Sequence, residues 1–227
     1  MSTTTAPRPF PVVTVTVAAV AYALVATLAL ALEPPAKGWA VLACSVGGCV
    51  ALVVVARQAG RSDWLAALGV LIPISIFQVL PDWFLADGLG TLHFPDTGAV
   101  RVGHVIPLAM AGMWAIPLFV VYVAARGSAA RGAVVAFLFF LATELLAPAV
   151  DLWGPAGGVR EILGVAVYVL PAEAVLGAAT VIAVRETAQR SFGVRILAAL
   201  AVSTLYTGAL ALCWFLIDHA DLTLSAS

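Results

Sequence analysis

Charged side chains are scarce in this sequence. They make up only 10% of the 227 residues, whereas 63% of the residues are hydrophobic. A soluble domain carries roughly 25% charged residues, so this chain has too few to cover a surface that faces water. Its apolar runs last about 17–22 residues, and a helix of ~20 residues crosses the ~30 Å hydrocarbon layer of a bilayer. The scarcity of charge therefore predicts an all-α, polytopic membrane protein.

Other absences exclude particular functions. The single lysine, Lys37, lies between apolar runs, so no helix is expected to carry a retinal Schiff base. Three cysteines cannot form a disulfide framework. The sequence has no phosphate-binding P-loop, no dinucleotide-binding glycine fingerprint and no GxSxG nucleophile element. It also lacks the paired acidic tracts that bind a magnesium diphosphate, and nothing in it suggests nucleic-acid binding.

The apolar runs predict one integral-membrane helical domain over residues 1–227, with seven transmembrane helices. The expected spans are about 12–32, 39–56, 64–80, 105–125, 133–150, 163–184 and 196–217. The connections between them are short, except for a long loop over residues 81–104.

The basic residues predict the orientation of these spans. Cytoplasmic loops of membrane proteins collect arginine and lysine. If the N-terminus and every second loop lie on one side, that side holds eight of the eleven basic residues. They are Arg8, Arg57, Arg61, Arg126, Arg131, Arg185, Arg190 and Arg195. We therefore expect the N-terminus inside and the C-terminus outside, in a bacterial plasma membrane.

Acidic residues gather on the opposite, outer side, and two of them lie within spans. Eight acids, including Asp82, Asp218 and Asp221, fall in outer segments, whereas Glu144 and Glu173 interrupt the fifth and sixth spans. An ionisable residue inside a bilayer costs ~2.5–3.5 kcal/mol even on lenient scales, so it usually faces the interior of the bundle and serves a function. The alternative is a neutral acid that hydrogen-bonds between helices as structural support.

The depth of the two buried acids and the prolines beside them suggest a pocket. Glu173 lies roughly ten residues into its expected span, which corresponds to a depth of ~15 Å. Pro148 and Pro171 are expected to kink the helices and to free backbone carbonyls, as happens where helices line a cavity. Spans five and six would then enclose a pocket with Glu144 near its mouth. A carboxyl in such a pocket is expected to be protonated near neutrality.

Aromatic and polar residues complete the candidate site. Trp153, Tyr168 and Tyr206 are candidates to border the pocket, although anchoring at the membrane interface is the better explanation for any one of them taken alone. Pro81 is expected to end the third span, which leaves Asp82 and Trp83 at the outer rim.

The long loop has several possible roles of its own. Its apolar side chains predict a segment folded onto the bundle, with Arg101 placed to pair with an acid. His93 and Asp96 offer two metal ligands, but no histidine pair has a recognised ligand spacing, so no metal site is expected.

The chain resembles the small, seven-span membrane cyclases of isoprenoids, which include meroterpenoid cyclases and lycopene-cyclase-type carotenoid enzymes. The resemblance lies in size, span number and membrane acids, and in Pro171-Ala172-Glu173, which is similar to the Pro-x-Glu element of the carotenoid cyclases. Those enzymes carry a second acid after the glutamate, where this chain has Ala174.

The resemblance implies an enzyme that needs no cofactor. A carboxylic acid would protonate an alkene or epoxide of a lipophilic isoprenoid that arrives from the bilayer. Aromatic faces would stabilise the carbocation, and a second acid would remove the final proton. The predicted catalytic residues are Glu173, Glu144 and Asp82, and the predicted substrate-binding residues are Trp83, Trp114, Trp153, Tyr168 and Asp218.

Other functions stay open. A hydratase would use the same acids. Acids beside broken helices are also typical of proton-coupled transporters, and a metal-dependent lipid hydrolase or a structural partner remains possible. Membrane lipid is the expected environment and a partner of the basic loops. The sequence does not specify the substrate or the oligomeric state.

Overall fold

The computed structural model describes the backbone of residues 12–220 and the side chains of residues 16–220. Arg8 and Asp221, two of the charges used to predict the orientation, lie outside the described residues. The described part is mainly helical. Its helices are α1 (Val12–Leu30), α2 (Ala36–Gln58), α3 (Ser62–Phe77), α4 (Val79–Trp83), η1 (Phe84–Leu89), α5 (Met110–Met113), α6 (Ala115–Ala125), α7 (Ala129–Leu146), η2 (Pro148–Val150), α8 (Val169–Thr187), α9 (Phe192–Trp214) and η3 (Phe215–His219).

Several of these helices join end to end into longer rods. The α3, α4 and η1 segments form one run over residues 62–89, and α9 with η3 forms another over residues 192–219. Within the described residues, four rods are long and apolar enough to cross a membrane: 36–58, 62–89, 129–150 and 192–219. Residues 16–30 and 110–125 form shorter apolar helices. By length and composition, the chain is a helical membrane protein.

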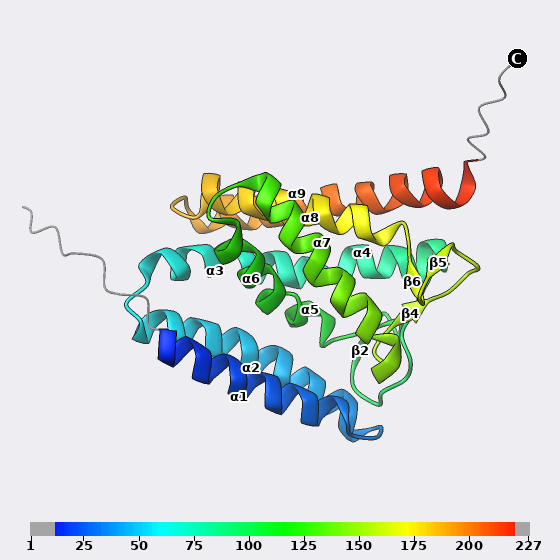
Figure 1. Cartoon of the computed structure of the whole chain (residues 1–227), viewed down its shortest axis with the longest axis horizontal. Helices are drawn as coiled ribbons and strands as arrows, with labels where there is room; N and C mark the ends of the chain where they lie inside the picture. Colours follow the sequence, from blue (N-terminus) through cyan, green and yellow to red (C-terminus); the bar gives the residue numbers. More distant parts are fainter. Residues whose placement is uncertain (1–11, 221–227) are drawn as a thin grey trace, which may run out of the picture.

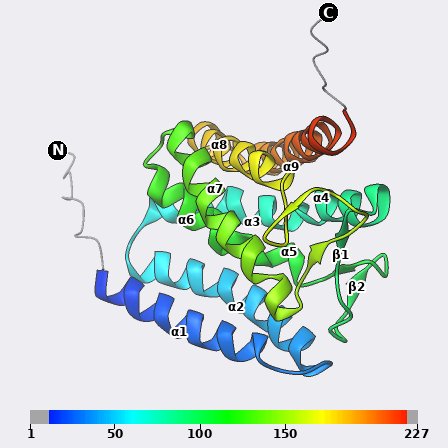
Figure 2. The same ribbon diagram turned by 45° about the vertical axis from the view of Figure 1, so that its right-hand side comes forward.

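The rods lie roughly along one direction in a layered bundle (Figure 1). The α1–α2 pair forms one side of the bundle and the α8–α9 pair the opposite side, with α3, α6 and α7 between them. The turned view in Figure 2 shows the same order. The centre of the bundle is apolar, because the side chains of Leu71, Ile74, Leu118, Leu176 and Leu210 are fully buried.

Short β-ladders close one end of the bundle. They are β1 (Leu92–His93) with β4 (Gly154–Pro155), β2 (Arg101–Val102) with β3 (Ile106–Pro107), and β5 (Glu161–Ile162) with β6 (Val165–Ala166), all antiparallel. The β1–β4 ladder joins the loop after η1 to the loop after α7. We call this end the hairpin end, and we call the opposite end, where Arg61, Arg126 and Arg185 lie, the basic end.

Three predicted span boundaries are wrong. The third rod does not end at residue 80 but continues to Leu89, after which Gly90 turns the chain with a φ of 66°. The fourth helical rod begins at Met110 rather than at residue 105, and α8 begins at Val169 rather than at residue 163. In both cases a β-hairpin takes up the apolar residues that precede the helix. Apolar composition alone does not separate a buried hairpin from the first turns of a helix.

The predicted proline kinks are also wrong. Pro171 occupies the first turn of α8, where its missing N–H has no intrahelical partner to lose. Pro148 begins the short turn η2 directly after α7 ends at Leu146, so it ends a helix instead of bending one. Glu173 is consequently the fifth residue of α8, not a residue ten positions into a span.

Helices α7 and α8 approach closely because glycines face each other. A Cβ added at Gly177 would stand 2.5 Å from the carbonyl oxygen of Gly132, and one added at Gly132 would stand 3.0 Å from that of Gly177. Small residues allow such backbone approach between membrane helices. Residues four apart in the sequence lie on the same face of a helix. Glu144 is three such steps from Gly132 on α7, and Glu173 is one such step from Gly177 on α8. The crossing at the glycines therefore sets the relative positions of the two acids.

Candidate functional site

Asp82 lies inside the third rod. The backbone N–H of Asp82 donates to the carbonyl of Gln78 over 3.2 Å, which continues the helical pattern past Pro81. Its side chain is 5% exposed, and its Oδ2 atom has no hydrogen-bond partner among the described residues. The placement of Asp82 at an outer rim is therefore wrong, and the residue is a buried acid of the bundle.

Glu144 lies near the end of α7, on the same face of the helix as Gly132. Its Oε1 accepts a hydrogen bond of 3.0 Å from the indole Nε1 of Trp153. Trp153 follows the turn after α7, just before strand β4. A donor to a carboxylate oxygen stabilises the ionised form of that carboxylate.

Glu173 is the most deeply buried of the three acids. Its side chain is 0% exposed, and neither carboxyl oxygen has a hydrogen-bond partner within the described part of the chain. The charges of Glu144 and Asp82 lie near enough to act on it. An ionised carboxylate without hydrogen bonds costs a large free energy in an apolar interior, so the neutral form is favoured.

A small cavity joins residues from several rods, and we call it the acid cavity. Its volume is about 30 Å³, and a single water needs roughly 10–15 Å³ by the same measure. It is lined by Asp82, Leu85, Leu92, Phe94, Met110, Trp114, Glu144, Trp153, Val169 and Tyr206. Two carboxyls thus face one space with four large aromatic side chains around it, while Glu173 lies behind the lining.

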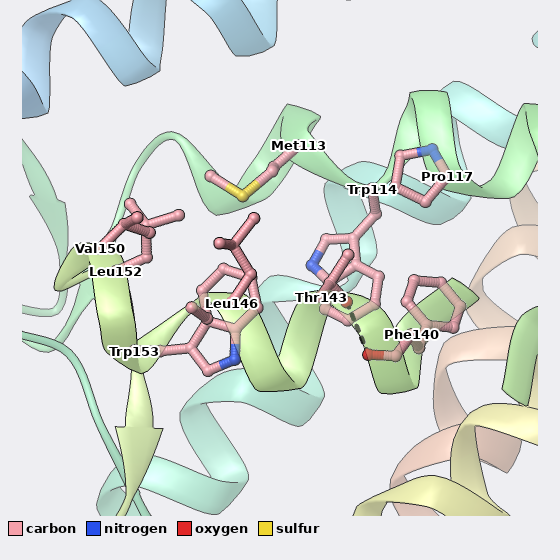
Figure 3. A pocket seen from close by; sticks show the side chains of 10 residues that line it. Met113, Trp114, Pro117, Phe140, Thr143, Leu146, Val150, Leu152 and Trp153 are labelled. Atoms are coloured by element: carbon pink, nitrogen blue, oxygen red, sulfur yellow. Dashed lines mark hydrogen bonds between the residues drawn. The ribbon is translucent and has the colours of Figure 1, made fainter. Parts of the chain in front are cut away.

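A second, apolar cavity adjoins the first, and we call it the apolar chamber (Figure 3). It measures about 150 Å³ and lies between the α5–α6 rod and the end of α7. Its lining is Met113, Trp114, Pro117, Phe140, Thr143, Leu146, Ala147, Val150, Leu152 and Trp153. Trp114 and Trp153 line both cavities, so these two indoles separate the apolar chamber from the acids.

Polar side chains continue inward from the acid cavity, and sequence analysis missed them. Gln78 and Ser75 lie four and seven residues before Asp82, on the same face of the third rod, and both are fully buried. Gln78 donates from Nε2 to Ser203 Oγ over 3.2 Å. Thr180 is likewise buried, seven residues beyond Glu173. The sequence does contain a signal for these polar residues, because they recur at helical spacing from the acids within otherwise apolar spans.

The remaining predicted substrate-binding residues do not line either cavity. Trp83 is 41% exposed and its ring lies against Gly103. The hydroxyl of Tyr168 is hydrogen-bonded to Thr91 Oγ1 at 2.8 Å, in the core. Asp218 accepts a hydrogen bond of 2.6 Å from the backbone N–H of Arg160. The hydrogen bonds of Tyr168 and Asp218 support the fold, and Trp83 lies outside both cavities.

The long loop is held together by Arg101. Its guanidinium donates to the carbonyls of Phe94, Pro95 and Val105, so the expected pairing of Arg101 with an acid is wrong. Asp96 Oδ1 accepts from the N–H of Gly98 over 2.9 Å, as in an Asx turn. Within residues 16–220, no group of three or more histidine, cysteine or acidic side chains is arranged to hold a metal ion.

The fold is a helical bundle with apolar rods long enough to cross a membrane, and its site is an aromatic-walled cavity lined by two carboxyls with a third behind the lining. Residues 79–217 match a family described as Domain of unknown function (DUF6989), and the chain belongs to this family. The matched region contains Asp82, Glu144 and Glu173. No curated protein and no solved structure matches the chain.

Proposed function

We propose that this protein is an integral-membrane enzyme that acts on a lipophilic isoprenoid by acid–base catalysis. The observation that supports it best is that Asp82 and Glu144, from two different rods, line a cavity walled by Trp114, Trp153 and Tyr206, while Glu173 of a third rod lies near enough to interact with both acids. Acids that meet in an apolar space favour the protonated form, and a protonated carboxyl is a proton donor.

The proposed reaction begins with transfer of a proton from a carboxyl to an alkene carbon or an epoxide oxygen. The alkene electron pair moves to the new C–H bond, or the C–O bond of the epoxide breaks. A neighbouring double bond then attacks the cationic carbon and closes a ring. Finally a carboxylate removes a proton from carbon and a new double bond forms, so the product is an isomer of the substrate and no cofactor is consumed.

The geometry favours Asp82 as the donor in contact with substrate. Asp82 lines the acid cavity, and Glu173 lies behind it, where it can replenish the proton through the same cluster. Glu144 suits the role of final base, because Trp153 donates a hydrogen bond to its carboxylate. General acid–base catalysis of this kind contributes about 10²–10⁴-fold to a rate.

The aromatic walls suit the cation that follows protonation. The face of an indole attracts a nearby cation, by about 2 kcal/mol when water is excluded. Trp114 lies between the acids and the apolar chamber, and it packs against Phe140 with 5.0 Å between ring centroids. If the apolar chain of a substrate occupied the chamber, its first double bond would lie next to both the indole of Trp114 and the acids.

The two cavities together are smaller than the ~300–1,000 Å³ typical of pockets for drug-sized ligands. The apolar chamber, whose lining comes mainly from the α5–α6 rod and α7, is only partly enclosed, which leaves an opening. We propose that the substrate enters laterally from the bilayer through this opening and leaves most of its tail in lipid.

The proposed setting is a bacterial plasma membrane crossed seven times, with the N-terminus inside. The seven rods are α1, α2, α3–α4–η1, α5–α6, α7, α8 and α9–η3. Successive rods run in opposite directions, so α1 begins at the basic end and η3 ends at the hairpin end (Figure 1). Because positive charge is retained on the cytoplasmic side, the basic end of the bundle would lie inside. The acid cavity would then lie nearer the outer face.

A proton-coupled transporter is the second candidate, because of the polar side chains that continue inward from the acids. Gln78, Ser75, Thr180 and Ser203 extend from the acid cavity toward the basic end, as a proton path through a bundle would. Proton flux into liposomes that contain the protein separates this candidate from the enzyme. Flux that depends on a co-transported solute supports transport, and product without flux supports catalysis.

The enzyme proposal is tested by expressing the chain in a host that supplies prenyl precursors and prenylated acceptors. Mass spectrometry of lipophilic extracts should reveal a new isoprenoid with wild type that is absent with Glu173→Gln and Asp82→Asn. Asp87→Asn is the matched control, because Asp87 lies on the same rod but is exposed. A product that survives both acid substitutions contradicts the proposed roles.

A further inference from the structure

The largest groove described lies away from the acid cavity, on the outside of the bundle. It measures about 610 Å³ and runs along α3 between α2 and the start of α9. It is lined by Val53, Arg57, Leu65, Leu68, Gly69, Ile72, Pro73, Ile76, Phe77, Phe192 and Ile196. Of these side chains Arg57 alone is charged, and it lies at the basic end.

A second arginine lies against one of the residues that line the groove. A Cβ added at Gly69 would stand 2.5 Å from Nη1 of Arg195, so the guanidinium lies directly against α3 where a side chain is missing. Arg195 donates from Nε to the carbonyl of Arg190 over 3.0 Å. Within the described residues neither Arg57 nor Arg195 pairs with a carboxylate, because the ion pairs found there are Arg61–Asp63 and Arg185–Glu186.

We infer that this groove binds an anionic diacyl phospholipid of the inner leaflet, with its phosphate at Arg57 and Arg195 and one acyl chain along α3. Guanidinium groups are well suited to phosphate, because their N–H donors match its oxygens. The guanidinium of Arg57 at the end of an otherwise apolar groove, and that of Arg195 against Gly69 in the α3 wall, provide the charge complement of such a lipid.

The dimensions of the groove agree with this occupant. Its α3 lining extends from Leu65 to Phe77, which corresponds to ~18 Å of helix at 1.5 Å per residue. One leaflet of a bilayer contributes ~15 Å of hydrocarbon. A headgroup at the basic end would therefore place its acyl chain along the full length of the groove, down to the side chains of Ile76 and Phe77.

The experiment is a competition measured by native mass spectrometry of the full-length protein. Phosphatidylglycerol and phosphatidylcholine with identical acyl chains are supplied together, so the headgroup, which is anionic in the first lipid and zwitterionic in the second, is the sole difference. Wild type is expected to retain phosphatidylglycerol preferentially. A basic residue at a membrane surface contributes ~1 kcal/mol to the binding of anionic lipid, so Arg57→Gln and Arg195→Gln should each reduce the preference about fivefold.

Arg185→Gln is the matched control, because Arg185 lies at the same end but outside the groove and pairs with Glu186. It should leave the preference unchanged. Equal retention of the two lipids by wild type, or an equal loss in all three variants, would overturn the inference. Neither result depends on the acids, so the lipid site and the proposed catalysis are tested separately.

Discussion

The indole Nε1 of Trp153 donates a hydrogen bond to Oε1 of Glu144 over 3.0 Å. Asp82 Oδ2 and both oxygens of Glu173, by contrast, have no such donor among the described residues. In this part of the chain the contrast is complete for Glu173, which lacks a donor on both oxygens and so favours its proton; at Asp82 only Oδ2 lacks one, and the indole of Trp114 lies near enough to act on this carboxyl. The proposed division into a base and two acids depends on this contrast.

Trp153→Phe should impair the final deprotonation. The substitution keeps an aromatic wall but removes the donor, and a hydrogen bond to a charged group contributes about 1.5–3 kcal/mol. Product formation should therefore fall roughly tenfold to a hundredfold, as measured by product mass spectrometry at equal protein levels. Trp39→Phe, at an exposed tryptophan in the first turn of α2, is the control. An unchanged rate would remove Glu144 from the proposed role.

Asp82→Asn should abolish catalysis without weakening the fold. Asparagine has nearly the shape of a protonated aspartic acid and is also neutral, so the buried site loses a proton donor but gains no charge. Product should fall by about 10²–10⁴-fold, while the apparent melting temperature in detergent should stay within a few degrees of wild type. A large drop in that temperature would indicate a structural role for Asp82 instead.

Tyr168→Phe should affect stability rather than chemistry. It removes the hydroxyl that is hydrogen-bonded to Thr91 in the core, and such a bond contributes about 1 kcal/mol. The melting temperature should fall by about 2–4 °C, and product formation should continue. If product is lost while the fold is retained, Tyr168 belongs to the site after all.

Gly177→Ala should destabilise the crossing of α7 and α8. The new Cβ would stand 2.5 Å from the carbonyl oxygen of Gly132, so the helices must move apart, and such overpacking costs about 1–3 kcal/mol. Gly208→Ala on α9 is the matched control, because nothing lies within 4 Å of its added Cβ. Thermal unfolding followed by size-exclusion chromatography should separate the two variants, and equal melting temperatures would contradict the described crossing.

The proposed orientation predicts which ends react with an impermeant thiol reagent. In a background without Cys44, Cys49 and Cys213, a cysteine at Gln58 should be labelled only when the inner face is accessible. A cysteine at Glu161, exposed at the hairpin end, should be labelled on intact cells. The reverse pattern would invert the topology.

Much of the helical architecture could be predicted from apolar runs alone. The α2 run, predicted over 39–56, extends over Ala36–Gln58, and the rod that starts with α9 was predicted within a few residues at each end. The third rod was cut short at Pro81, because proline usually ends a helix. In a membrane helix proline is tolerated when other groups satisfy the backbone, and the apolar residues after Pro81 allow the rod to continue.

The candidate site was only partly predictable. The rarity of acids in apolar spans identified Glu144 and Glu173, but their distance from Asp82 depends on how the rods pack. Trp83 and Tyr168 could not be separated from Trp114 and Trp153 by sequence, because all four are aromatic residues near span ends. The direction in which each side chain points in the folded bundle decides between them. Trp83 is exposed, whereas Trp114 is buried between the two cavities.

The most direct test of the central claim is to carry out the conversion in D₂O with purified wild-type protein and a prenylated substrate. With a substrate that carries alkenes and no epoxide, proton transfer from a carboxyl that has exchanged with solvent should place one carbon-bound deuterium in each product molecule, which mass spectrometry detects as an increase of one mass unit. Asp82→Asn should yield no such product. A product of unchanged mass, or a substrate that stays intact across the prenylated compounds supplied, would contradict acid-initiated cyclisation by this protein.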